Sequence, residues 1–131
     1  MADSILELAQ KLVQQLSSLD ADGGLADILH ENAVLVTPGS TFAASKRSRA
    51  EILDYFKNRV FPRFKKVTFT PSDIFIDPDK SVAVIEWDSE LEPANGTIYQ
   101  NNGVWVVHVG DGLIVQVKEY FDTEKVTKNV R

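Results

Sequence analysis

The spacing of apolar residues changes once along this chain, and that change limits the folds available to it. Up to Pro62 apolar side chains recur every three or four residues, as on one face of an α-helix. From Val67 onward they alternate with polar side chains, as in half-buried β-strands. Helices followed by consecutive strands predict an α+β fold, with the helices packed on one face of an antiparallel sheet.

Three helices and one short strand are expected before the spacing changes. The first helix spans Met1–Leu19 and the second Leu25–Glu31, and the short strand Ala33–Val36 follows. The third helix begins at a capping box, in which Ser48 and Glu51 each satisfy a backbone N–H of the first turn. These helices supply the layer that covers the sheet.

Four strand regions are expected after the change, joined by turns rich in Gly, Pro and Asp. Pro71 interrupts the first of them and predicts a bulge or a sheet edge there. Gly110-Asp111-Gly112 predicts a tight hairpin before the last strand. The expected strand regions are Val67–Ile76, Val82–Leu91, Thr97–Val109 and Leu113–Phe121.

Composition excludes several kinds of protein. The 131 residues are expected to form one domain over 1–131. The chain has no cysteine, which excludes disulfides, thiolate metal sites and cysteine nucleophiles. The longest apolar run, Val104–Val107, is far shorter than the ~18 residues of a membrane span, and the N-terminus has no signal-peptide pattern. We expect a cytoplasmic protein without metal or cofactor.

Charge is divided unevenly along the chain. The formal net charge of −5 argues against a general nucleic-acid binder. Residues 46–66 nevertheless hold eight basic and two acidic side chains, a local charge of +6 that leaves −11 for the rest. This basic segment either attracts an anionic substrate or balances the acidic sheet, and the sequence leaves both interpretations open.

The strand Val82–Leu91 carries acids on one face only. Glu86, Asp88 and Glu90 share that face, and Trp87 lies on the other. From alternation alone the acids form a solvated face, and Trp87 belongs to the core.

Two segments resemble a known family. They are Asn32-Ala33-Val34-Leu35-Val36-Thr37-Pro38 and the long run from Val104 to Asp122, which ends in Lys118-Glu119-Tyr120-Phe121-Asp122. The chain resembles the NTF2-like superfamily, in particular its SnoaL-like branch, near the ketosteroid isomerases and limonene epoxide hydrolases. The resemblance implies a curved sheet that wraps a pocket closed by helices, and a homodimer paired through the outer sheet face. The superfamily holds isomerases, hydrolases, cyclases and non-catalytic binders, so fold alone does not give function.

The epoxide hydrolase pattern implies a pair of acids. Its two aspartates fall on Asp88 and Glu119, which would then act as catalytic acid and base across the pocket. Its bridging arginine falls on Glu86, and its water-holding tyrosine and asparagine fall on Leu35 and Thr37, so the water site is not reproduced. A cyclase-like role would need one such carboxyl with a pKa raised by burial.

The ketosteroid isomerase pattern matches less well. Its general base falls on Thr37, its tyrosine near Gln15 and its second aspartate near Val104. Thr37 can hydrogen-bond a ligand but is not a base near neutral pH. The proton-handling set of that enzyme is therefore absent.

The remaining candidate substrate-binding residues follow from the implied pocket and from alternation along the last strands. An irregularity at Asn102-Gly103 would reverse the facing of the residues before it. The expected substrate-binding residues are Thr37, Phe56, Val60, Glu86, Tyr99, Asn101, Val117 and Phe121.

Three functions remain open at this point. The first is an isomerase, cyclase or hydrolase that acts on a small hydrophobic molecule of polyketide, steroid or terpenoid type through Asp88 and Glu119. The second is a non-catalytic ligand-binding protein. The third is a dimeric interaction module that works through its outer sheet face. They differ in whether a cavity exists and in whether it holds a carboxyl group.

Overall fold

The computed structural model describes residues 2–37 and 45–130, which build helices on one side of a six-stranded sheet. The strands lie in the order β2-β1-β6-β5-β4-β3. The described helices and helical turns are α1 (Ala2–Ser18), η1 (Ala21–Leu25), α2 (Ala26–Ile28), α3 (Arg49–Tyr55), η2 (Phe56–Val60), η3 (Phe61–Arg63) and α4 (Thr123–Val130). The strands are β1 (Leu29–Thr37), β2 (Ser45–Ser48), β3 (Phe64–Asp77), β4 (Val82–Pro93), β5 (Tyr99–Gly110) and β6 (Leu113–Phe121).

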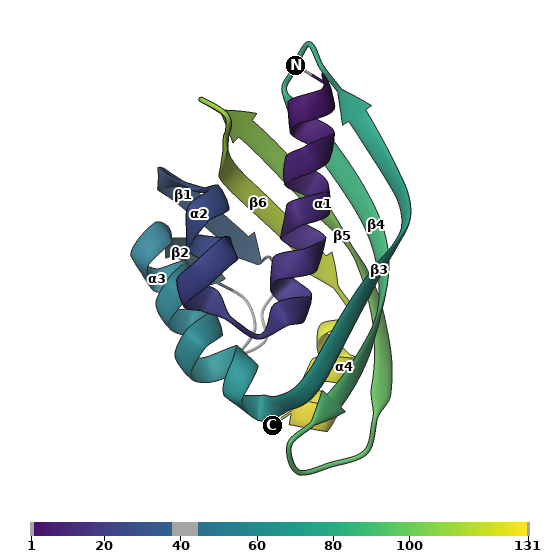
Figure 1. Ribbon diagram of the computed structural model, residues 1–131. Coiled ribbons are helices and arrows are strands. Elements are labelled where there is room, and N and C mark those ends of the chain that lie inside the picture. The colour runs from purple at the N-terminus through teal and green to yellow at the C-terminus, as the bar shows by residue number, and fades with distance from the viewer. Residues whose placement is uncertain (1, 38–44, 131) are drawn as a thin grey trace.

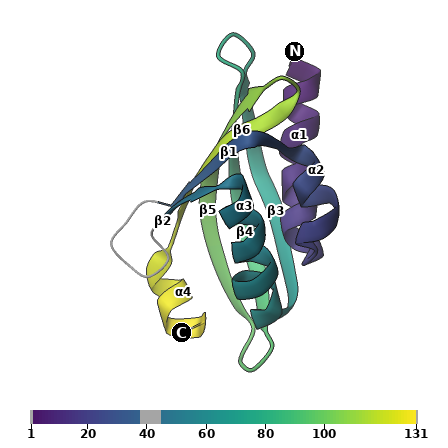
Figure 2. The same cartoon turned by 90° about the vertical axis from the view of Figure 1, so that its left-hand side faces the viewer.

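The sheet is antiparallel except where β1 pairs with β6 in parallel. Figures 1 and 2 show α1 lying along the long strands, with α2 and α3 beside it on the same side of the sheet. This arrangement confirms the expected α+β fold of helices on a mostly antiparallel sheet.

Helix α1 packs its apolar face on the sheet because its apolar residues recur at helical spacing. Ile5, Leu12 and Leu16 are buried in the common core. Two hydrogen bonds add to this contact. The Ser17 hydroxyl donates to the Val13 carbonyl at 3.0 Å and accepts from the Phe69 backbone N–H at 3.0 Å. The hydrogen bond to Phe69 fixes the end of α1 against the edge strand β3.

The predicted capping box, the irregularity at Pro71 and the hairpin before the last strand are all present. The capping box at the start of α3 forms as expected, with the Ser48 and Glu51 side chains each bonded to the other's backbone N–H. Strand β3 lies at the sheet edge and its register shifts between Pro71 and Asp73, so both consequences expected of that proline occur. Asp111 and Gly112 adopt positive φ in the hairpin before β6.

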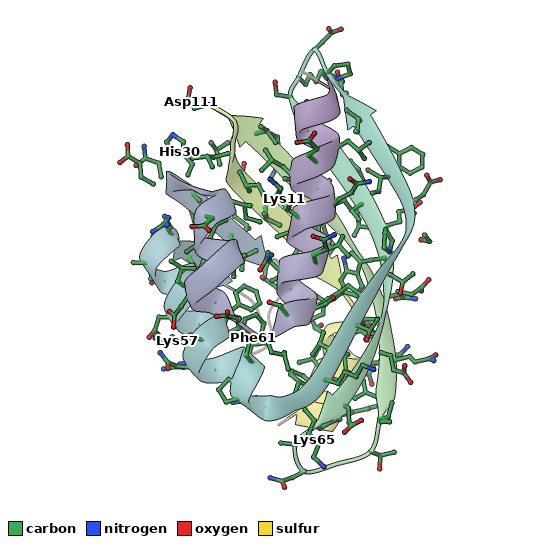
Figure 3. The ribbon with its side chains drawn as sticks, viewed as in Figure 1. Lys11, His30, Lys57, Phe61, Lys65 and Asp111 are labelled. Carbon is green, nitrogen blue, oxygen red and sulfur yellow. The ribbon has the colours of Figure 1, made fainter. Side chains whose placement is uncertain are left out.

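Other expectations are corrected. The second helix is shorter than Leu25–Glu31, because β1 already begins at Leu29. His30 therefore lies in a strand, where its Nε2 is 3.3 Å from Asp111 Oδ2; Figure 3 shows the two side chains together. Pairing is regular through Asn102 and Gly103, and the register shift falls later, between His108 and Val109. The sequence did not predict β2 and α4.

Among the described helices, none is both long and apolar enough to cross a membrane.

Candidate functional site

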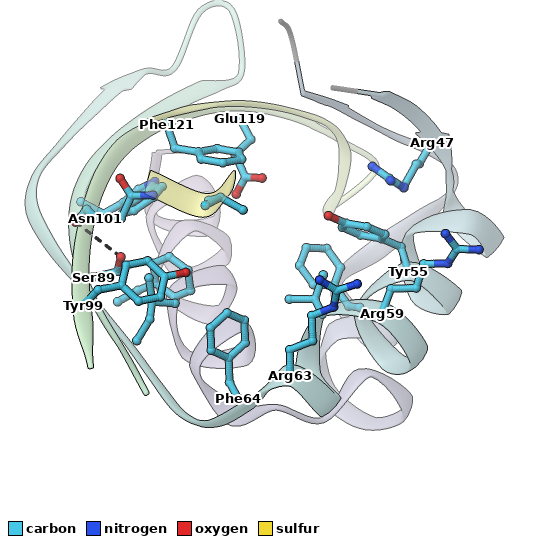
Figure 4. A pocket seen from close by; sticks show the side chains of 16 residues that line it. Arg47, Tyr55, Arg59, Arg63, Phe64, Ser89, Tyr99, Asn101, Glu119 and Phe121 are labelled. Carbon is cyan, nitrogen blue, oxygen red and sulfur yellow. Dashed lines mark hydrogen bonds between the residues drawn. The ribbon is translucent and has the colours of Figure 1, made fainter. Parts of the chain in front are cut away.

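A cavity of about 200 Å³ opens between the concave face of the sheet and the segment from β2 to η3 (Figure 4). Each long strand from β3 to β6 contributes side chains to one wall, and Val126 of α4 reaches it from the C-terminal end. The described lining residues are Arg47, Tyr55, Phe56, Arg59, Val60, Arg63, Phe64, Phe69, Trp87, Ser89, Leu91, Tyr99, Asn101, Glu119, Phe121 and Val126. An apolar cavity with a few polar groups is typical of a small-molecule site.

Most of the residues expected to bind a substrate lie in this lining. Val117 lines a smaller neighbouring cavity of about 20 Å³, which shares Phe56 and Glu119 with the main one. Thr37 is buried at the end of β1 but is not among the lining residues. The expected substrate-binding residues found in the lining are Phe56, Val60, Tyr99, Asn101 and Phe121, and the expected catalytic residue Glu119 lies there as well.

The expected pair of acids is not formed. Asp88 and Glu86 are exposed on β4, while Trp87 and Ser89 between and beside them are buried and line the cavity. Successive side chains of a strand point to opposite faces, so the two acids lie on the outer face of the sheet. The placement of Asp88 opposite Glu119 and of Glu86 at the substrate is therefore corrected.

Glu119 is the one carboxylate among the described lining residues. It stands on β6 directly across from Trp105 of β5, whose indole Nε1 donates to Glu119 Oε2 at 2.7 Å. Burial raises the pKa of the Glu119 carboxyl above its ordinary value, while the Trp105 hydrogen bond and the Arg47 charge act to lower it. Glu119 is therefore held in one orientation and is more easily protonated than an exposed glutamate.

Arg47 of β2 and Tyr55 of α3 lie together on one side of the cavity, near Glu119. The Arg47 guanidinium carbon lies 3.5 Å from the centre of the Tyr55 ring, a cation–π contact. Burial raises the pKa of the Tyr55 hydroxyl; the nearby Arg47 lowers it and Glu119 raises it further. Tyr55 is therefore a neutral hydrogen-bond donor at neutral pH, and Figure 4 shows its hydroxyl directed into the cavity.

The opposite wall offers neutral polar groups. The Ser89 hydroxyl donates to the Asn101 carbonyl at 3.4 Å, and the Asn101 side-chain amide donates to the Asp122 carbonyl at 3.2 Å. Burial raises the pKa of Tyr99 to about 12, which keeps its hydroxyl protonated. Asn101 thus connects the cavity wall to the start of α4.

Aromatic rings form the floor between these walls. Phe69, Trp87 and Trp105 pack against one another with ring centres 4.9 to 5.2 Å apart, and the Phe69 ring stands nearly perpendicular to the Trp87 ring. Gly103 makes room for Trp87, because a Cβ at that position would clash with the Trp87 ring and the Tyr120 carbonyl. In the described part of the chain Trp87 Nε1 is buried without a hydrogen-bond partner. Phe69 and Trp87 therefore present apolar ring surface to a ligand in the cavity.

Sequence reasoning missed the arginines of the cavity. Arg47, Arg59 and Arg63 come from β2, η2 and η3, three short elements within residues 45–63, and none of the three was among the expected site residues. The local excess of positive charge in residues 46–66 was the signal that marked them. Across residues 2–37 and 45–130, no group of three or more His, Asp or Glu side chains is placed to hold a metal ion.

Comparisons with known structures agree on the fold. PrhC from Penicillium brasilianum NBRC 6234 superposes with a TM-score of 0.85 at 17% identity, over 97% of this chain and 85% of that one. BvnE pinacolase from Penicillium brevicompactum gives 0.84 at 16% identity, over 96% and 88%. The Δ5-3-ketosteroid isomerase from Mycobacterium sp. gives 0.77 at 17% identity, over 92% and 95%. No curated protein matches the sequence.

The family model described as SnoaL-like domain matches residues 9–117. That stretch reaches from the middle of α1 into β6 and includes most of the cavity wall. The chain belongs to the SnoaL-like domain family, within the NTF2-like superfamily.

Proposed function

We propose that this protein is an isomerase or cyclase that moves a proton on a small hydrophobic carbonyl compound, with Glu119 as the acid/base. The observation that carries the proposal is the environment of Glu119: a carboxyl in the cavity wall, oriented by Trp105 and with a pKa raised by burial. A raised pKa brings a carboxyl towards the range in which it both takes and returns protons.

The proposed step needs no other reactant. The ionised Glu119 carboxylate removes a proton from the carbon next to the carbonyl, and the electron pair of that C–H bond moves onto the carbonyl oxygen as an enolate. Tyr55 and Arg47 lie beside Glu119 and supply a hydrogen-bond donor and a positive charge for that oxygen. Glu119 then returns the proton to another carbon, or the enolate carbon attacks a second carbonyl to close a ring and Glu119 protonates the resulting alkoxide.

Hydrolysis by two acids has no support in this geometry. Such a mechanism needs an acid to protonate the epoxide and a base to activate water, and Asp88 lies on the outer face. A single carboxyl suits proton transfer within one substrate, which narrows the reaction class to isomerisation or cyclisation.

The substrate class follows from the lining. Rings from Phe64, Phe69 and Phe121 favour a polyketide-, steroid- or terpenoid-like body, and Ser89 and Tyr99 provide hydrogen bonds on the far wall. Two proteins of similar structure, a pinacolase and a Δ5-3-ketosteroid isomerase, are consistent with this class.

Proton exchange tests the proposal without knowledge of the natural substrate. We would incubate 2-tetralone, a compact ketone with acidic α-hydrogens, in D2O and follow loss of its α-proton signals by NMR. The wild-type protein should accelerate exchange above buffer, and Glu119→Gln should lose at least ~10²-fold of that acceleration, as expected for a general base.

Asp88→Asn is the matched control, because it also removes one carboxylate charge, but from an exposed position on the outer face of the sheet. It should exchange 2-tetralone at the wild-type rate. Quenching of tryptophan fluorescence measures binding in all three proteins. Binding without accelerated exchange would overturn the catalytic proposal in favour of a ligand-binding protein, and equal exchange by Glu119→Gln would remove Glu119 from the mechanism.

We also infer that two copies pair through the outer face of the sheet in the cytoplasm. Half-buried valines at positions 84, 104 and 106 and the 46% exposed Tyr120 lie on that face, which supports an interface.

A further inference from the structure

A second, smaller cavity adjoins the main one at Glu119. It measures about 20 Å³ and has residues of α1, α3, β1 and β6 around it. Phe56 and Glu119 line both cavities, so the two spaces meet at these side chains. Figure 4 shows the Glu119 carboxyl directed into the main cavity from β6. We call the smaller space the side cavity, and its apolar lining includes Leu12, Leu16, Leu35, Ile52 and Val117.

The side cavity suits an apolar group rather than a water molecule. Among its described lining residues only Glu119 and Trp105 carry a polar side-chain atom, and Trp105 Nε1 already donates to Glu119 Oε2 at 2.7 Å. A buried water molecule needs about two to four polar partners, and here one carboxyl group is available. An alkyl group needs none, so it fits this lining without leaving a polar atom unpaired.

The size of the side cavity limits the group that it can hold. Its volume of about 20 Å³ is slightly more than the ~10–15 Å³ that one water-sized group requires. A methyl group fits such a space, whereas a ring system fits only the main cavity of about 200 Å³. The two volumes together indicate a ligand with a hydrophobic body in the main cavity and a small branch beside Glu119.

We propose that the natural ligand carries a methyl or other short alkyl branch on or next to the carbon that faces Glu119, and that the side cavity binds this branch. The inference rests on the proposed function for the reacting carbon, but the subsite itself needs only a ligand in the main cavity. A group held there excludes water from Glu119 and fixes which carbon of the ligand lies against its carboxyl. Val117 then contacts the ligand through the branch.

Three phenyl ketones test for the branch. Acetophenone, propiophenone and butyrophenone share one ring and one carbonyl, and they carry a hydrogen atom, a methyl group or an ethyl group on the carbon next to the carbonyl. Dissociation constants come from NMR titrations of the carbon-13-labelled methyl groups of the protein. The wild-type protein should bind propiophenone about 4-fold more tightly than acetophenone, the ratio for one buried methyl group. Nuclear Overhauser contacts should join that methyl group to Val117 and Leu35.

Two variants change the volume of the side cavity in opposite directions. Val117→Ile adds one carbon to the lining, so it should bind propiophenone no more tightly than acetophenone. Ile52→Val removes one carbon, so it should bind butyrophenone about 4-fold more tightly than propiophenone, a gain that the wild type lacks. Because any apolar site favours an added methyl group, an unchanged preference for propiophenone in Val117→Ile would overturn the proposal.

Val107→Ile is the matched control. Val107 pairs directly with Val117 across β5 and β6 and is also buried, but it is not among the described lining residues of either cavity. This variant should keep the wild-type preference for propiophenone. If it loses the preference as Val117→Ile does, the effect comes from general repacking of the sheet and the proposed subsite is excluded.

Urea unfolding of the same two variants shows whether there is free space beside Val117. Val117→Ile should unfold at the wild-type urea concentration or above it, because the added carbon enters a cavity. Val107→Ile should unfold at a urea concentration roughly 1 M lower, because Val107 is fully buried in the packed core. An equal loss in both variants would mean that the side cavity has no room for a branch.

Two outcomes separate this inference from the proposed function. If Val117→Ile abolishes the preference for propiophenone but no ketone exchanges its α-protons faster than in buffer, the proton transfer fails and the subsite stands. If exchange is accelerated and depends on Glu119 while propiophenone shows neither preference nor contact with Val117, the subsite fails and the proton transfer stands.

Discussion

At the residue scale, one position in β4 decides which chemistry the site can support. The resemblance to epoxide hydrolases places an acid on Asp88, whereas simple alternation places Asp88 outside and Trp87 inside. The structure agrees with alternation. If the alignment of two distantly related strands is wrong by one residue, every side chain is assigned to the wrong face of the sheet. A catalytic role carried over from a related family therefore depends on the alignment register more than on the residue type.

Glu119→Gln should stabilise the protein at neutral pH. A raised pKa means that the folded state holds the proton more tightly than the unfolded state, so this group favours folding most below its unfolded pKa of ~4.3. That contribution is lost as pH rises through the folded pKa. Urea unfolding at pH 7 should show a gain of ~0.5–2 kcal/mol that shrinks near pH 4.

Asp88→Asn serves as the control for this stability measurement, since its exposed side chain should change unfolding by no more than ~0.5 kcal/mol. A loss of stability in Glu119→Gln at pH 7 would contradict the proposed cost of the buried charge.

Gly103→Ala should destabilise the fold by ~1–3 kcal/mol, the usual cost of overpacking. The added Cβ would meet the Tyr120 carbonyl and the Trp87 ring, and both belong to rigid parts of the sheet. Gly96→Ala is the comparison, because the nearest atom to its Cβ is a Pro93 carbon at 3.4 Å. Urea unfolding of the two variants measures the difference, and similar values would contradict the close approach.

At the element scale, periodic segments could be predicted and short polar ones could not. The last strand was predicted with its observed bounds, Leu113–Phe121, because the tight hairpin before it marks its start. Strand β2, Ser45–Ser48, has no apolar alternation and exists through its pairing with β1. The arginine Arg47 that it carries into the cavity was missed for the same reason.

Ser48→Ala should cost ~1 kcal/mol, the usual value of an N-cap. The Ser48 hydroxyl accepts from the Glu51 backbone N–H at 3.4 Å, and Glu51 Oε1 accepts from the Ser48 backbone N–H at 3.0 Å. Thermal unfolding measures the loss, with Ser72→Ala on exposed β3 as control. An unchanged midpoint would show that the box contributes nothing to the start of α3.

At the scale of the whole molecule, the two faces of the sheet carry different features. The concave face holds the cavity and all the lining strand residues, whereas the outer face holds the acids of β4 and a row of half-buried valines. Three arginines and Glu119 line the cavity, whereas the acids Glu86, Asp88 and Glu90 of β4 are exposed on the outer face. The sequence predicted the basic excess in residues 46–66, but the three-dimensional structure is needed to show which of these cations reach the cavity.

Val106→Glu should convert the proposed dimer to a monomer. Val106 lies between Val84 and Lys118 on the outer face, where a new carboxylate would be buried against its copy. Sedimentation velocity should give the mass of a dimer for the wild type and of a monomer for the variant. Ile98→Glu is the control, since Ile98 is 50% exposed outside the strands. A monomeric wild type would contradict the interface.

The proposed function depends on Glu119 being a carboxyl with a raised pKa inside a small-molecule cavity. The most direct measurement is a titration of the Glu119 side-chain carboxyl by carbon-13 NMR, with its signal assigned through Glu119→Gln. The titration should give a pKa above the ordinary glutamate value, because burial outweighs the Trp105 hydrogen bond and the Arg47 charge. A pKa at or below the ordinary value would contradict it.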